Sequence, residues 1–274
     1  SLGEVLGQLF VKEHFSPEAK KKVSEMVEHL RFAFRERIEK LEWMSPETKE
    51  QALVKLASFE YKIGYPDKWK DYSSLQIKDD SYWQNIVRAS EFAYAEMIDE
   101  LGKPVDKAKW YMSPQTVNAY YNPSSNEICF PAGILQPPFF YMDGDDAINY
   151  GGIGVVIGHE ITHRFDDQGR KFDKAGNLAE WWTTEDAKRF EERAKVLVDY
   201  FDNIVVLDTV HANGSFTLGE NIADHGGLQV SYHAFLKTQQ AKAGEFLDGF
   251  TPAQRFFLSY AALWAGNVRD AEIL

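Results

Sequence analysis

The chain has 274 residues, of which 44% are hydrophobic and 14% aromatic, so it can bury a substantial core and lacks the composition of a disordered protein. Acidic residues outnumber basic ones by 42 to 30, and a formal net charge of -12 is the wrong sign for contacts with a phosphate backbone. The single cysteine, Cys129, excludes a disulfide within the chain, and no apolar run is long enough to cross a bilayer. We therefore expect a folded protein with no nucleic-acid partner and no membrane segment.

The N-terminal part is predicted to be helical. Apolar residues recur at three- and four-residue steps between Ser16 and Trp43, with a capping serine followed by proline at the start. The same start signal recurs at Ser45-Pro46-Glu47, and the apolar face of this second helix extends to Phe59 before Gly64-Tyr65-Pro66-Asp67 ends it.

A polar, turn-rich stretch from Asp67 to Asp80 then connects to a helix predicted over Tyr82 to Leu101. We place a domain boundary near Asp80, which divides the chain into residues 1–80 and 81–274.

After Ala108 the residue pattern changes to short segments rich in residues that favour β-strands. Helical patterns return after the paired prolines Pro137-Pro138. Cys129 falls in one of these segments and is predicted to be a buried residue of a strand. The chain is thus predicted to be mainly α with a small β-sheet. The expected strands are Lys109–Met112, Thr116–Tyr121 and Glu127–Phe130, and the expected helices are Ala147 to about Phe165, Thr183–Phe201, Leu218–Lys237 and Pro252–Trp264.

The predicted helix from Ala147 contains a His-Glu-x-x-His pattern at His159, Glu160 and His163. Histidines four residues apart project from one face of a helix, where they can bind zinc as a pair. Glu160 lies next to this pair and can take a proton from a zinc-bound water. The alternative is a pair of core histidines with hydrogen-bond partners of their own.

A third zinc ligand is expected in the segment Gly219 to Asp224, because catalytic zinc sites generally use three protein ligands and keep a position open for water. Glu220 suits that role, and Asp224, one helical turn later, suits a carboxylate that orients a ligating imidazole. Two acids four residues apart are by themselves commonly just a solvated helix face.

Taken together, the segments His159 to Asp167 and Gly219 to Asp224 resemble the paired signatures of the neprilysin family of zinc metallopeptidases. The similarity is dense after Trp110 and weaker over the N-terminal helices. It extends through Val117–Tyr121, Asn126–Phe140, Asn149–Gly154, Trp181-Trp182 and Gly249–Tyr260.

The resemblance implies a thermolysin-like catalytic domain over residues 81–274 and part of a second, helical lobe with its linkers over residues 1–80. It also implies one Zn2+ per chain, bound by His159, His163 and Glu220. Glu160 is then the catalytic base that assists attack of a zinc-bound water on a peptide bond.

The family resemblance assigns further residues to orienting the ligands and holding the substrate. Asp224 and Asp166 match partners of the two histidines, and Asp224 is counted with Glu160 in the catalytic set. Asn118 and Ala119 match the motif that holds the backbone of a peptide substrate. Three apolar residues match a pocket for the residue after the scissile bond, with plain core packing as the alternative: Phe139, Val156 and Trp264.

Two departures from the family pattern stand out. Arg164 replaces a glycine after the zinc motif, and we interpret it as an outward-facing surface arginine that favours the helix C-terminus. Family members also continue beyond the position of Leu274, with a His-Ser-Pro segment and an arginine that stabilise the oxyanion and hold the substrate. We therefore expect a piece shortened at both ends, for which the missing C-terminal segment is a candidate partner.

The leading function is a zinc metalloendopeptidase that hydrolyses oligopeptides, slow or inactive as an isolated piece. The alternatives are a zinc-stabilised peptide-binding module without turnover and a helical structural protein without metal. A lone cysteine fits a bacterial member better than the disulfide-rich animal ones. The compartment stays open from the sequence, with export or association with a bacterial cell envelope as one expectation for the parent protein.

Overall fold

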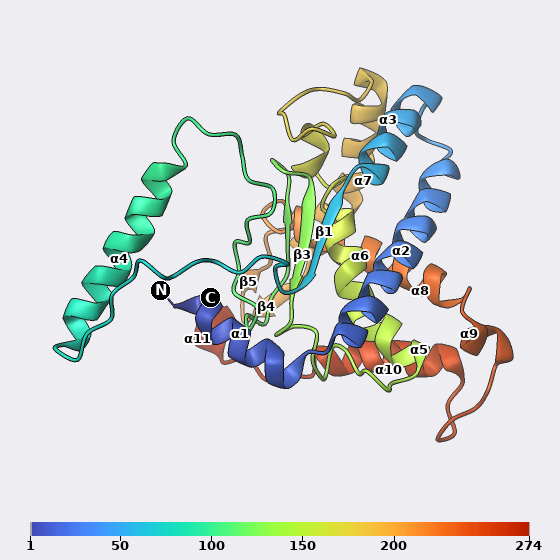
Figure 1. Ribbon diagram of the computed structural model, residues 1–274. Helices are drawn as coiled ribbons and strands as arrows, with labels where there is room; N and C mark the ends of the chain where they lie inside the picture. Colours follow the sequence, from blue (N-terminus) through green and yellow to red (C-terminus); the bar gives the residue numbers. More distant parts are fainter. Residues whose placement is uncertain (1, 274) are drawn as a thin grey trace.

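The computed structural model describes residues 2–273 and is mainly helical, with two small sheets (Figure 1). Its elements, in chain order, are α1 (Gly3–His14), α2 (Pro17–Glu39), α3 (Pro46–Ala57), β1 (Glu60–Gly64), α4 (Tyr82–Asp99), β2 (Tyr120–Asn122), β3 (Glu127–Pro131), α5 (Asp146–Asn149), the π-helical turn η1 (Tyr150–Gly154), α6 (Val155–Thr162), the 3-10 turn η2 (Gly169–Lys171), α7 (Thr184–Asp202), β4 (Val205–Leu207), β5 (Val210–His211), α8 (Leu218–Phe235), α9 (Gln239–Ala243), α10 (Pro252–Leu263) and α11 (Asp270–Ile273).

The larger sheet has the strand order β1-β3-β2. Strand β1 pairs in parallel with β3, so that Glu60 lies opposite Glu127, and β2 pairs with the other side of β3 in the antiparallel sense. All five residues of β3 are buried, which fits a central strand, and β2 forms an edge. The smaller sheet is the hairpin of β4 and β5.

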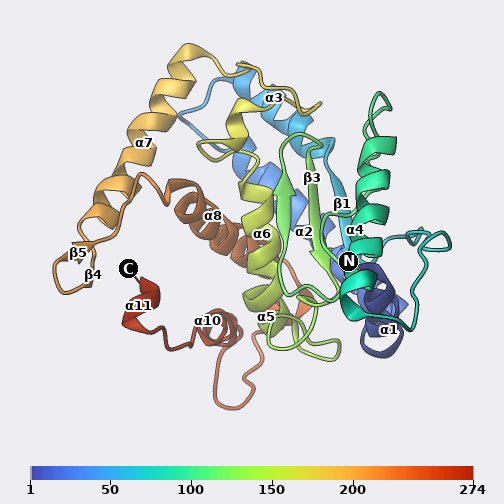
Figure 2. The same cartoon turned by 90° about the vertical axis from the view of Figure 1, so that its left-hand side faces the viewer.

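Helix α6 lies between this sheet and helix α8, and α2 packs against both helices (Figure 2). One hydrophobic core joins these elements, with fully buried residues such as Leu30 of α2, Ile128 of β3 and Ile157 of α6. Residues from either side of the boundary predicted near Asp80 therefore share a sheet and a core. That boundary stays a prediction.

Two of the expected elements near the sheet are wrong. The second helix ends at Ala57 instead of continuing toward Gly64, and the residues from Glu60 onward form β1. They do so because pairing with β3 satisfies their backbone groups and buries Ile63, which a short helical periodicity cannot reveal. The expected strand Lys109–Met112 has no strand pairing and consists of bends and irregular backbone.

The long helix expected from Ala147 to about Phe165 is interrupted. The π-helical turn η1 separates α5 from α6, and Gly152 within it leaves the helical region at φ -91° and ψ -106°. A Cβ at Gly151 would lie 2.2 Å from the backbone oxygen of Phe256 in α10, so a residue without a side chain is needed there. The glycines of this turn thus allow close packing at the cost of helix continuity.

Helix α4 stands away from the sheet at the end of two extended connections (Figure 1). Ser81 caps the helix, which starts at Tyr82 as predicted and ends at Asp99, and none of its residues is buried. Among residues 2–273, no helix combines the length and the apolar character that a membrane crossing requires.

Candidate metal centre

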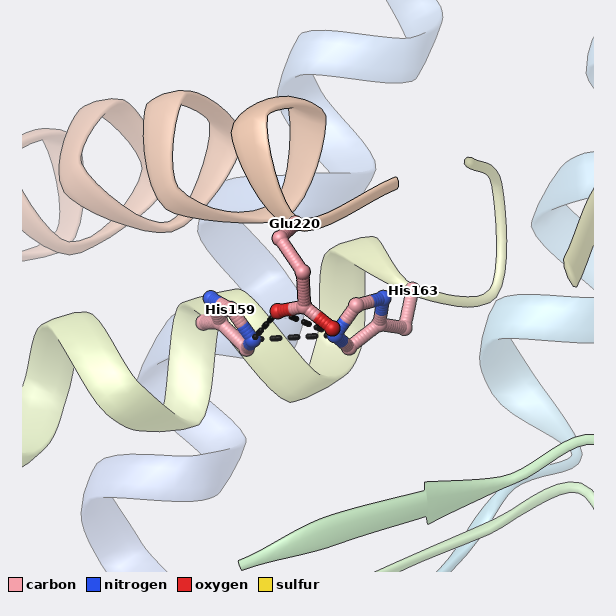
Figure 3. Close-up of side chains that lie close together, drawn as sticks. All are labelled: His159, His163 and Glu220. Atoms are coloured by element: carbon pink, nitrogen blue, oxygen red, sulfur yellow. Dashed lines mark hydrogen bonds and ion pairs between the residues drawn. The ribbon is translucent and has the colours of Figure 1, made fainter. Parts of the chain in front are cut away.

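His159 lies in helix α6 and His163 caps its C-terminal end one turn later, so that both imidazoles emerge on the same face (Figure 3). Their Nε2 atoms are 2.9 Å apart. The Oε2 atom of Glu220, at the start of α8, lies 3.3 Å from Nε2 of His159 and 3.7 Å from Nε2 of His163. The three residues predicted as metal ligands therefore converge, with one ligand atom from each within 4.8 Å of the others.

Glycines bring α8 close enough to α6 for Glu220 to reach the histidines. A Cβ at Gly227 of α8 would lie 2.5 Å from the backbone nitrogen of His159, and one at Gly158 of α6 would lie 2.7 Å from the backbone oxygen of Gly227. A Cβ at Gly226 would lie 2.6 Å from the Thr162 side chain. Any larger residue at these points would separate the helices, so the glycines set the spacing of the site.

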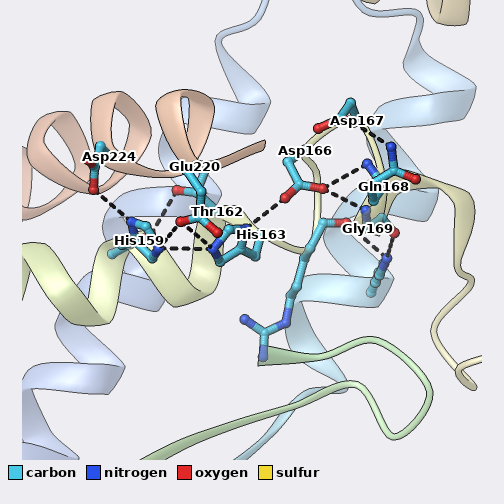
Figure 4. Close-up of polar contacts among 12 residues, drawn as sticks. His159, Thr162, His163, Asp166, Asp167, Gln168, Gly169, Glu220 and Asp224 are labelled. Atoms are coloured by element: carbon cyan, nitrogen blue, oxygen red, sulfur yellow. Dashed lines mark hydrogen bonds and ion pairs between the residues drawn. The ribbon is translucent and has the colours of Figure 1, made fainter. Parts of the chain in front are cut away.

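Two carboxylates orient the imidazoles (Figure 4). Nδ1 of His159 lies 2.8 Å from Oδ1 of Asp224, and Nδ1 of His163 lies 2.7 Å from Oδ2 of Asp166. A carboxylate accepts the proton of the nearer ring nitrogen, which leaves the Nε2 lone pair free for a metal.

The donor set fits a zinc ion. Two Nε2 lone pairs and a carboxylate oxygen facing one another repel unless a cation lies between them. Tetrahedral bonds of about 2.0–2.1 Å place neighbouring ligand atoms roughly 3.3 Å apart, close to the separations observed here. The imidazole and carboxylate ligands are also of the type that zinc prefers.

Glu160 lies between the two histidines in sequence and is only 7% exposed. Burial raises the pKa of its carboxyl group, although the imidazoles of His159 and His163 oppose that shift. For His163, burial favours the neutral ring, but the Asp166 hydrogen bond and the charges of Glu160 and Glu220 outweigh it and raise the pKa of the imidazole. The centre is thus an electrostatically coupled cluster.

A groove of about 450 Å³ opens beside these residues. Its lining includes residues of the edge strand β2 and the two residues before it, Asn118 and Ala119, together with Gln168 and Gly169. Asn118 is exposed, whereas Ala119 is buried. A strand edge along such a groove can pair with the backbone of an extended peptide.

The structure places the other predicted substrate residues outside the lining of this groove. Phe139 and Val156 are half-buried and pack against the hydrophobic core, and Trp264 is 63% exposed at the end of α10. Their role in a substrate pocket stays a prediction.

The interpretation of Arg164 as an outward-facing residue is wrong, because its side chain is fully buried. Its guanidinium carbon lies 3.7 Å from the centroid of the Phe59 ring and 4.9 Å from that of Tyr121, and its Nε donates to Oδ1 of Asn126 over 3.2 Å. Burial lowers the pKa of Arg164 to about 9, so the group still carries its charge at neutral pH. The aromatic faces and the amide offset only part of the cost of burying this cation, since its two terminal nitrogens have no hydrogen-bond partner among residues 2–273.

Two features around the site that were not predicted, the burial of Arg164 and the close approach of α8 to α6, had signals in the sequence. Arg164 is spaced three residues after Ile161 and seven after Ile157, both fully buried, so helical periodicity places it on the inward face. The pair Gly226-Gly227 inside a helical pattern indicates a close approach of another backbone. The contact with Asn126 had no local signal, since it joins residues 38 positions apart.

The chain matches known proteins over nearly its whole length. The model of peptidase family M13 matches residues 118–274, and the N-terminal model of the same family matches residues 1–66. The chain is 42% identical to an endothelin-converting enzyme homolog of Locusta migratoria and 40% identical to neprilysin of Homo sapiens. These alignments cover 99% and 98% of the chain, but 39% and 38% of the relatives.

Solved structures agree with the sequence comparisons. The fold matches the zinc metalloprotease Zmp1 of Mycobacterium tuberculosis, solved with an inhibitor, with a TM-score of 0.90 and 45% identity over 99% of this chain and 42% of that one. It matches PepO of Lactobacillus rhamnosis with a TM-score of 0.86 and 38% identity over 96% of this chain and 40% of that one. The chain thus spans about two fifths of the length of these proteins.

Proposed function

Because the chain belongs to peptidase family M13, we propose that it forms the zinc-binding part of a metalloendopeptidase that hydrolyses peptide bonds of oligopeptides. The observation that carries this proposal is the convergence of His159, His163 and Glu220 beside Glu160 at the floor of a groove with a strand edge. Each of these residues has a part in peptide hydrolysis.

We assign one zinc ion per chain to the two histidines and Glu220. When bound, zinc supplies a Lewis acid that polarises a peptide carbonyl and lowers the pKa of water. The carboxylates of Asp224 and Asp166 hold the imidazoles of His159 and His163 in the tautomer that exposes Nε2, over 2.8 and 2.7 Å. These partners make the ligand set more rigid and more basic.

Glu160 acts as the proton carrier. Its buried carboxylate lines the groove beside both histidines, where it can take a proton from the attacking water and then pass it to the departing amine.

The edge of β2 is the binding surface for the peptide backbone. Asn118 and Ala119 precede this strand at the groove wall, where an extended substrate can add as a further strand and use main-chain hydrogen bonds without demanding one side-chain sequence. We therefore expect oligopeptides of varied sequence as substrates.

The substitution Glu160→Gln tests the mechanism. It keeps the shape of the side chain and removes its basicity, so peptide cleavage should fall at least about a hundredfold while zinc content stays near one per chain. Glu192→Gln, at an exposed position on α7, is the matched control and should leave both unchanged. Cleavage at the original rate by Glu160→Gln would contradict the role of this residue.

The same measurements address a peptide-binding module without turnover. That function requires a wild-type chain that holds zinc and binds peptides but cleaves none at any pH. A wild-type chain that takes up no zinc would contradict both functions.

A further inference from the structure

We infer that Lys55, more than a hundred residues before the zinc motif, is a positioning residue that sets the orientation of His163 through the loop carrying Asp166. This inference rests on the proposed zinc site and names a residue outside it. Lys55 belongs to α3 and its side chain is only 1% exposed.

The Lys55 ammonium group lies inside a ring of backbone carbonyl oxygens. Its Nζ donates to the oxygens of Arg164, Gly169 and Phe172 over 2.9, 2.7 and 2.6 Å. Burial, with a smaller contribution from the charge of Arg164, lowers the pKa of Lys55 to about 7. In its charged form the group has three protons and no acceptor, and these three bonds then use its full donor capacity. A buried cation without such acceptors would be strongly unfavourable, and the loop is thereby held in the one shape that brings the three carbonyls together.

The same loop carries the partner of His163. Oδ1 of Asp166 accepts from the backbone N–H groups of Gln168 and Gly169 over 2.9 and 2.6 Å, while its Oδ2 faces Nδ1 of His163. Gly169 thus contributes its N–H to Asp166 and its carbonyl to Lys55. A shift of the loop away from Lys55 would therefore move Asp166 as well.

The loop also packs directly against His163, at the C-terminal end of helix α6. A Cβ at Gly169 would lie 1.8 Å from the backbone oxygen of His163, so the loop backbone has no room to move inward. The three bonds from Lys55 hold the loop in this position. The position of the His163 imidazole therefore depends on a residue that touches neither the imidazole nor the groove.

A double-mutant cycle on zinc affinity tests this inference without a need for activity. The zinc dissociation constant is measured by competition with a chromophoric chelator for the wild type, Lys55→Met, Asp166→Asn and the double variant. Partners of metal ligands typically contribute 10- to 100-fold in affinity, so we expect a loss of that size for Asp166→Asn and about tenfold for Lys55→Met. Since Lys55 acts through Asp166, the double variant should bind zinc about as well as Asp166→Asn alone.

Lys62→Met is the matched control. Lys62 is also a buried lysine, on β1, and its Nζ donates to Oε1 of Glu127 and to the backbone oxygen of Lys109 over 2.8 and 2.7 Å. This variant should lose stability yet keep the zinc dissociation constant within about threefold, because neither partner supports a zinc ligand.

The measured zinc affinities distinguish a failure of the proposed zinc site from a failure of the role of Lys55. A wild-type chain without zinc affinity would contradict the zinc site itself. Normal zinc binding by the wild type, with multiplicative losses in the double variant or no loss in Lys55→Met, would overturn the role of Lys55 alone. If circular dichroism shows that Lys55→Met does not fold, Lys55→Gln, which keeps two donors, replaces it in the cycle, with a smaller loss of zinc affinity expected and the same absence of a further loss when it is combined with Asp166→Asn.

Discussion

Helices α4 and α6 both follow from apolar residues at helical spacing, yet they lie in opposite surroundings. Helix α6 has eight residues and buries six of them between α2, α8 and the sheet. Helix α4 has 18 residues and buries none, and it meets the chain around it through the Lys70–Glu96 ion pair and the stacked rings of Tyr72 and Phe92. Apolar periodicity indicates that a helix forms, but its burial depends on which partners reach it.

The largest effect in this comparison is expected from Gly227→Val, which separates α8 from α6. The new side chain would meet the backbone of His159 and Val155, which cannot rotate away, so α8 must shift together with Glu220 and Asp224. We expect a loss of about 3 kcal/mol or more in the free energy of unfolding, measured in urea, and weaker zinc binding.

Gly266→Val is the control for that change. Among residues 2–273, no atom beyond the adjoining residues lies within 4 Å of a Cβ built at Gly266, so this variant should be close to neutral. Equal stability of the two variants would show that the spacing of α6 and α8 is not limited by Gly227.

A smaller effect is expected at Asp186, a buried carboxylate that joins the starts of α3 and α7. It accepts from the backbone N–H and hydroxyl of Ser45 and from the hydroxyl of Thr48. Asp186→Asn should lower the free energy of unfolding by about 2 kcal/mol at pH 7, since bonds to a charged group are stronger than neutral ones.

The Asp186 contribution should depend on pH. Burial alone would raise the pKa of this carboxyl, but the bonds from Ser45, Thr48 and Thr183 outweigh it and lower the pKa from 3.8 to about 2. A lowered pKa in the folded state stabilises the protein above about pH 4, and this stabilisation is lost as the pH falls toward 2. Urea unfolding is measured with a chelator present, which removes any effect of zinc release. The free energies of unfolding of the wild type and Asp186→Asn should converge as the pH falls from about 4 toward 2.

The smallest effect is expected on α4. Trp83 is 68% exposed, so Trp83→Ala should change the free energy of unfolding by less than about 0.5 kcal/mol. Ile157→Ala on α6, at a fully buried position, should cost about 2–5 kcal/mol. Comparable losses for these two substitutions would remove the contrast between the helices.

Much of the metal centre could be predicted from the sequence, because its central features are local. A four-residue spacing places His159 and His163 on one face of a helix without any knowledge of the fold. Glu220 required a second motif and the family resemblance, since 57 residues separate it from His163 in the sequence. The helices α2, α7, α8 and α10 were similarly predictable from caps and periodicity to within a few residues.

The tertiary structure decided what surrounds that centre. Strand β1 exists because β3 is there to pair with it. At the helix interruption, the backbone N–H of Ile153 donates to the backbone oxygen of Phe139, a residue outside the helix, and Gly152 lies close to the same oxygen. The burial of Arg164 and the carbonyl ring around Lys55 depend on contacts between residues 38 and more than a hundred positions apart. Local spacing therefore determined which side chains can bind a metal, whereas long-range packing decided how rigidly they are held, because the energy of a buried polar contact depends on partners that are distant in the sequence.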